Sequence, residues 1–190
     1  GSGTGAHILR ERPTTSVEPG DLRTVTKHVA VGQPHIQIQG GYTHVSLSAP
    51  AHMAYSGTYI GIPGYPLLPK TGVRFELSRW AEVKGVKVVS GSTEVRHVSC
   101  MVMPCPRPGI PSAGLPPVLH ADMSIYGSDA WYPHKLYSYR VGVGLNVTLG
   151  ERVKYVDVEL YPVQYMPAGA TLLCHRDLTV SVEYEVHSAK

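Results

Sequence analysis

The clearest pattern in this sequence is a two-residue alternation of apolar and polar side chains over residues 178–186. Leu178, Val180 and Val182 are separated by polar residues, and the spacing continues to the end of the run. Successive side chains of a β-strand point to opposite faces of a sheet, so this spacing predicts a strand with one buried face and one wet face. Such a strand needs partner strands and an apolar layer to pack against.

The same alternation recurs along the chain. Shorter apolar runs of this kind cover residues 36–39, 45–47, 73–78, 86–89, 95–102, 137–143 and 156–160. Tyr161-Pro162 ends the last run because proline has no N–H to donate to a ladder, and residues 164–170 form a turn-rich link to Leu172 and Leu173. Roughly eight or more short strands predict an all-β antiparallel sandwich in a single domain.

Composition agrees with this fold class and excludes several others. Gly and Pro together make up about a fifth of the 190 residues, which leaves little room for long helices. Hydrophobic residues reach 43% and charged residues only 16%, unlike a disordered chain. The formal net charge of +3, without a dense Lys/Arg run, does not indicate nucleic-acid binding. No apolar stretch approaches the roughly 18–20 residues of a membrane span.

The N-terminal region differs from the rest. Residues 1–5, Gly-Ser-Gly-Thr-Gly, are interpreted as a cloning remnant rather than a signal peptide. We expect residues 1–35 to hold this remnant and then an N-terminal arm or an edge strand. The sandwich itself is expected over residues 36–187.

The residues that could carry chemistry do not form a recognisable site. Ten histidines and three cysteines show no repeated metal-ligand spacing, so we expect no metal, no cofactor and no catalytic residue. Buried thiols are the simpler interpretation of Cys100, Cys105 and Cys174, with a Cys100–Cys105 bridge as the alternative. Asn146-Val-Thr148 matches a glycosylation sequon, which in a hairpin indicates a turn.

One segment breaks the rhythm of the strands. Residues 104–117 contain six prolines in fourteen residues, which favours an extended, pre-ordered backbone over sheet or helix. Long proline-rich loops in compact domains are either functional or disordered. Arg107 is the only Lys or Arg between Arg96 and Lys135.

The order of several segments resembles the N-terminal propeptide of the gingipain family of cysteine proteases, over about residues 36–186. The matching segments are Gly61–Pro69, Val86–Ser90, Met101–Pro104, Ser124–Tyr126, Trp131–Pro133, Val156–Pro167 and Leu172–Tyr184. The most specific piece is Pro162-Val-Gln-Tyr165 with Pro167, which looks like the family's Pro-x-Gln-Tyr-Asn-Pro signature. Met166 stands where the family usually has Asn.

The resemblance implies a jelly-roll-like β-sandwich that precedes a caspase-like catalytic domain in a secreted, extracytoplasmic zymogen. Such a propeptide keeps the protease latent, acts as an intramolecular chaperone and is removed by proteolysis. It is not itself an enzyme, so the three cysteines inherit no catalytic role. The alternative is an extracellular β-sandwich module that binds carbohydrate or protein through Tyr and Trp side chains.

The resemblance also implies an inhibitory loop, here over residues 104–118. In the best known members of the family, a basic side chain of this loop enters the protease's specificity pocket like a substrate side chain. If the cognate enzyme prefers basic residues, Arg107 is the candidate, flanked by Pro106 and Pro108; otherwise an apolar residue such as Leu115 takes its place. The simpler interpretation of Arg107 is a solvated loop arginine. A bond that leads into proline is a poor cleavage site for many proteases.

Overall fold

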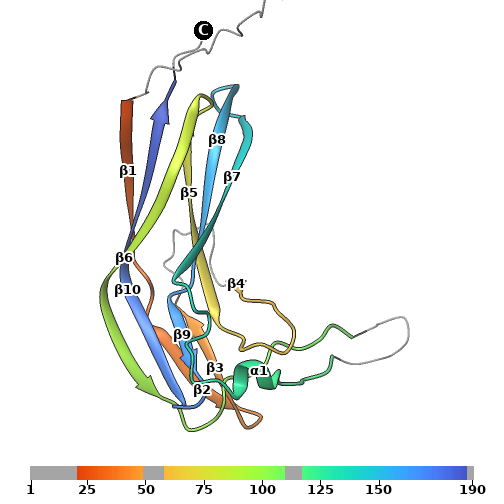
Figure 1. Cartoon of the computed structure of the whole chain (residues 1–190). Coiled ribbons are helices and arrows are strands. Elements are labelled where there is room, and N and C mark those ends of the chain that lie inside the picture. The colour runs from red at the N-terminus through yellow and green to blue at the C-terminus, as the bar shows by residue number, and fades with distance from the viewer. Residues whose placement is uncertain (1–20, 49–57, 110–116, 188–190) are drawn as a thin grey trace, which may run out of the picture.

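The protein folds into antiparallel β-structure with a single turn of helix. The computed structural model describes residues 21–48, 58–109 and 117–187 (Figure 1). Its strands are β1 (Asp21–Val29), β2 (Pro34–Gln39), β3 (Tyr42–Leu47), β4 (Thr58–Tyr59), β5 (Pro69–Ser78), β6 (Ala81–His97), β7 (Tyr137–Asn146), β8 (Glu151–Leu160), β9 (Val163–Met166) and β10 (Thr171–Val186). The helical turn α1 spans Met123–Tyr126. The prediction of an all-β sandwich is confirmed.

Two sheets face each other in the half of the molecule that holds β1, β5, β7 and β8 (Figure 1). One sheet has the order β1-β10-β6, with β9 also paired to β10, and the other has the order β4-β5-β8-β7. Apolar side chains from both sheets fill the space between them. The most buried are Val29, Phe75, Leu77, Ala81, Val156, Val158, Leu160, Leu178, Val180 and Val182.

A second core lies at the other end of the long strands, where the β2–β3 hairpin, β9 and α1 gather (Figure 1). Its buried side chains are Val45, Ile60, Leu68, Val102, Tyr126, Val163, Tyr165, Leu172 and Cys174. Strand β10 contributes to both cores, and between its two contributions Asp177 has a φ of 52°. A Cβ on Gly91 of β6 would lie 3.1 Å from the Asp177 carbonyl oxygen. Glycine therefore allows β6 to follow β10 closely where the core changes.

The structure refines the predicted strands. Residues 86–89 and the start of 95–102 belong to one long strand, β6, and residues 171–186 form one strand, β10. The interpretation of residues 164–170 as only a link is wrong, because β9 pairs with β10 over Val163–Met166. Strand β8 ends at Leu160, before Tyr161-Pro162 as predicted. The Asn146 side chain accepts from the Thr148 and Leu149 amides and so forms a turn.

Strand β1 lies within the N-terminal region. It pairs with β10 in full antiparallel register from Asp21 opposite Val186 to Val29 opposite Leu178. Residues 1–20 lie outside the described residues. Within the part of the chain that is described, no helix is long and apolar enough to cross a membrane.

Candidate functional site

The proline-rich segment leaves the second core through a backbone ladder. Thr43 of β3 donates its N–H to the Met101 carbonyl (2.8 Å) and accepts from the Met103 N–H (3.0 Å). On the other side, the Cys105 N–H donates to the Tyr65 carbonyl (2.7 Å). Because these residues pair on both sides, the chain is fixed up to the start of the loop.

A two-bond bridge closes the base of the loop. The Arg107 N–H donates to the Val118 carbonyl (2.9 Å), and the Val118 N–H donates to the Arg107 carbonyl (3.3 Å). The described limbs of the loop, up to residue 109 and from residue 117, project away from both sheets on the side of α1 (Figure 1). Leu115 lies outside the described residues, so its predicted role stays a prediction.

Gly64 holds both limbs of this loop. Its N–H donates to the Cys105 carbonyl (2.8 Å) on the outgoing limb, and its carbonyl accepts from the Asp122 N–H (2.9 Å) on the returning limb. Its φ is +86°, which L side chains rarely adopt, and a Cβ there would lie 3.2 Å from the His120 carbonyl oxygen. In the sequence, Gly61–Pro69 stood out only as a segment that resembles the family, and no pattern there indicated that it holds the loop.

Arg107 has a fixed backbone and an exposed side chain. Among the described residues, no hydrogen bond or ion pair holds its guanidinium. Pro106 is half-buried and Pro108 is exposed, so exposure to solvent increases from Pro106 to Arg107 and Pro108. Hydrogen bonds from the Ser124 hydroxyl and amide lower the pKa of the Asp122 carboxyl, and the charges of His120 and Arg107 lower it further. The loop base therefore keeps a charged carboxylate beside an available arginine.

The three cysteines are unpaired in the structure. All three are free thiols, with Cys105 and Cys174 buried and Cys100 half-buried, so the alternative of a Cys100–Cys105 bridge is not formed. Burial raises the pKa of Cys105 and of Cys174. A nucleophilic cysteine needs the opposite shift.

A buried polar triad supports the Pro162–Tyr165 segment. The Gln164 amide donates to the Pro133 carbonyl (2.6 Å), so its oxygen accepts from His175 Nε2 (2.8 Å). His175 Nδ1 is then the ring nitrogen without a proton, and it is buried with no hydrogen-bond partner among the described residues. Burial lowers the pKa of His175, which keeps the ring neutral. The glutamine of the sequence motif thus joins β9, β10 and the loop at residue 133.

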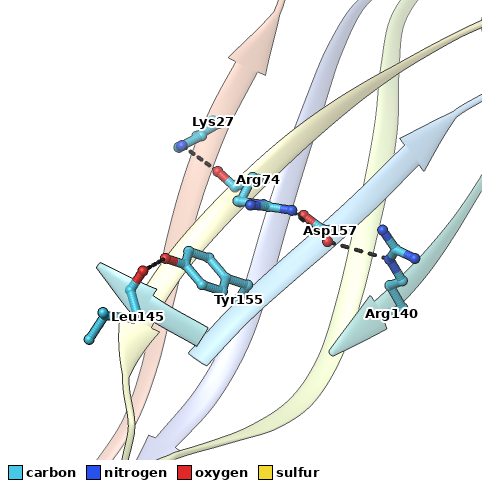
Figure 2. A network of polar contacts seen from close by, with 6 residues as sticks. All are labelled: Lys27, Arg74, Arg140, Leu145, Tyr155 and Asp157. Atoms are coloured by element: carbon cyan, nitrogen blue, oxygen red, sulfur yellow. Dashed lines mark hydrogen bonds and ion pairs between the residues drawn. The ribbon is translucent and has the colours of Figure 1, made fainter. Parts of the chain in front are cut away.

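A shallow groove of about 380 Å³ lies on the outer face of β5, β8 and β7. Figure 2 shows Asp157 of β8 between Arg74 of β5 and Arg140 of β7. Arg74 binds both carboxylate oxygens of Asp157 (Nε at 2.5 Å, Nη2 at 3.0 Å), and Arg140 Nε lies at 3.4 Å. The hydrogen bond from Arg74 is the main reason that the pKa of Asp157 is lowered. The sequence held no signal for this cross-strand group, since its members are distant along the chain.

One cluster has metal-ligand side chains. Ligand atoms of Glu82, Glu185 and His187 lie within 4.8 Å of one another. Lys84 Nζ lies 3.0 Å from a carboxylate oxygen of each glutamate, so an ammonium already supplies the positive charge there.

No family model and no curated protein matches the chain. Among solved structures, a complex of the pro- and mature domains of RgpB from Porphyromonas gingivalis matches with a TM-score of 0.59 and 16% identity, covering 88% of this chain and 81% of that chain. The chain shares the fold of a gingipain prodomain. A structure that addresses zymogenic latency of gingipain K, from the same organism, matches this chain with a TM-score of 0.58 and 17% identity. That match covers 90% of this chain and 95% of the other.

Proposed function

We propose that this chain is the prodomain of a secreted gingipain-like cysteine endopeptidase and is not itself catalytic. The observation that carries the proposal is the shared fold with a gingipain prodomain solved in complex with its mature domain. The raised pKa of the buried thiols supports a non-catalytic role. The prodomain assists folding of the catalytic domain outside the cytoplasm and is then removed by proteolysis.

Latency arises from the loop over residues 104–118. Its base is already ordered by the Arg107–Val118 bridge and by Gly64, so little conformational freedom is lost when the loop enters a cleft. Arg107 contributes its side chain to a specificity pocket that prefers basic residues. Its own N–H and C=O are already used by Val118, so the guanidinium makes the recognition contact.

The loop resists cleavage for two reasons. The Arg107 carbonyl accepts a hydrogen bond from Val118, which limits how far it can turn toward an oxyanion hole. The following residue is Pro108, whose ring locks φ and makes the amide tertiary. A loop of this kind binds like a substrate and is released uncut.

The experiment is a titration of the purified chain into its mature catalytic domain, with hydrolysis of a small chromogenic substrate as the readout. Competitive inhibition at micromolar concentration or below supports the proposal. Full activity in the presence of excess chain would overturn it. Leu115→Ala and Arg107→Ala variants then decide which side chain of the loop enters the pocket.

A further inference from the structure

Strand β7 is a free edge with its backbone groups open. It pairs only with β8, and no other described element lies beside it in Figure 1. The Tyr161 N–H donates to the Leu136 carbonyl (2.8 Å), which makes this pair hydrogen-bonded. Hydrogen-bonded and non-hydrogen-bonded pairs alternate along an antiparallel ladder, so the odd-numbered residues of β7 direct N–H and C=O away from β8.

A second contact agrees with this assignment. The Tyr155 ring lies against Gly144 of β7, where a Cβ would be 2.4 Å from a ring carbon. Its hydroxyl donates to the Leu145 carbonyl (3.1 Å), as Figure 2 shows, and that carbonyl keeps its second lone pair.

The same odd-numbered residues form an exposed apolar row. Tyr139 and Val141 are each 46% exposed, Val143 is 68% exposed and Leu145 is 56% exposed. They continue the face on which the Tyr137 hydroxyl reaches the Val86 carbonyl of the opposite sheet (2.6 Å). At Tyr137 this face of β7 packs against the opposite sheet. From Tyr139 to Leu145, no described residue covers the same face.

Strands β1, β4 and β6, which are also edges of the two large sheets, carry the usual protection against pairing. Strand β1 presents the charges of Arg23 and Lys27, and β4 has only two residues. Strand β6 carries Lys84 and Lys87, and its ladder with β10 shifts register. Strand β7 has no proline, no register shift and one charged residue, so it lacks these devices.

We propose that β7 pairs antiparallel with β7 of a second copy of this chain, with Gly142 on the two-fold axis. In this register Val141 faces the partner's Val143, and Tyr139 faces the partner's Leu145. These are odd-numbered residues on both sides, so their open N–H and C=O groups meet as hydrogen-bonded pairs. The exposed apolar row of each copy then lies beside the same row of the other copy, which covers part of it.

The distance between the two copies of Arg140 favours this register over the one centred on Val141. Arg140 faces the partner's Gly144, and the two Arg140 side chains are four positions apart, or roughly 13 Å. A register centred on Val141 would make the two arginines diagonal neighbours, which like charges disfavour. The proposal does not depend on the function proposed above, because it rests on β7 alone.

Two measurements on the purified full chain test it. Light scattering at about 100 μM should show a dimer, because a weak self-association has a micromolar Kd. Val143→Lys, which places a charge in the apolar row, should raise the dimer Kd about tenfold or more. Gly142→Cys should form a disulfide-linked dimer under mild oxidation, since paired Cα atoms about 4.5 Å apart suit a disulfide.

The cross-linking experiment has matched controls. A Cβ at Gly142 meets no atom within 4 Å, so the variant should fold. Arg140→Cys places a thiol on the same face of β7 but out of reach of its copy, and the wild type reports on the three native thiols. A monomer at about 100 μM, or equal cross-linking of Gly142→Cys and Arg140→Cys, would overturn the proposal and leave the edge to a different partner.

Discussion

Arg107 and Val118 exchange both of their backbone hydrogen bonds across eleven positions of the chain and so close a projecting loop. The bridge fixes the backbone of Arg107 and leaves its side chain exposed. A substrate-like inhibitor needs both properties, because a rigid backbone limits the entropy lost on binding and a free side chain can fill a pocket.

Gly64→Ala is expected to loosen this loop. The substitution strains a backbone at φ +86° and brings a Cβ to 3.2 Å from the His120 carbonyl. We expect a loss of about 1–3 kcal/mol in the free energy of unfolding and weaker inhibition of the cognate protease. Gly61→Ala is the matched control, because no atom lies within 4 Å of a Cβ there. Equal denaturant midpoints for the two variants would contradict this role of Gly64.

Acid should destabilise the fold through His175. Its pKa is lowered from the ordinary value of 6.5 by burial, so below about pH 6.5 the unfolded chain takes up a proton that the folded chain refuses. The free energy of unfolding therefore falls as pH drops from that value, with a slope of at most about 1.4 kcal/mol per pH unit for one group. Above pH 6.5 both states are neutral and the effect disappears.

His175→Gln isolates this contribution, since a glutamine amide can still donate to Gln164 but does not titrate. The difference in unfolding free energy between wild type and variant should change with pH only below about 6.5. Parallel pH profiles for the two proteins would show that His175 is not the group concerned.

The Arg74–Asp157 pair is expected to contribute little stability despite its two-bond geometry. The Arg74 side chain is 41% exposed and that of Asp157 is 22% exposed, so water screens the attraction. A double-mutant cycle with Arg74→Gln and Asp157→Asn should give a coupling of about 0.5–1 kcal/mol. Molar salt should reduce it.

This pair also predicts a pH dependence. The lowered pKa of Asp157 means that its contribution is present above the ordinary carboxyl value of 3.8 and is lost as pH falls through the lower folded value. A coupling that does not fall at any pH below 3.8 would contradict this assignment.

The sequence predicted the scaffold better than the site. Alternation located β8 and much of β10 because each has one dry face and one wet face. It missed β9, because Val163, Gln164 and Tyr165 are all buried and show no alternation. The one-turn helix α1 is too short to leave a periodic signal, and Asp122 caps it through local hydrogen bonds.

The loop shows the same limit. The prolines indicated where the loop lies in the sequence. The pairing of Arg107 with Val118 and the hydrogen bonds of Gly64 to both limbs depend on which segments meet in space. No local pattern carries that information. The group around Asp157 was missed for the same reason, since its three charged members come from three strands.

The inhibition constant of Arg107 variants against the mature cognate protease shows whether the Arg107 side chain fills the specificity pocket. Wild-type chain, Arg107→Lys, Arg107→Ala and the control Lys135→Ala would be compared, with melting temperatures to confirm folding. We expect that Arg107→Ala raises the inhibition constant about 30-fold or more, that the value for Arg107→Lys lies between those of wild type and Arg107→Ala, and that Lys135→Ala matches wild type. An inhibition constant for Arg107→Ala equal to that of wild type would contradict this role of Arg107.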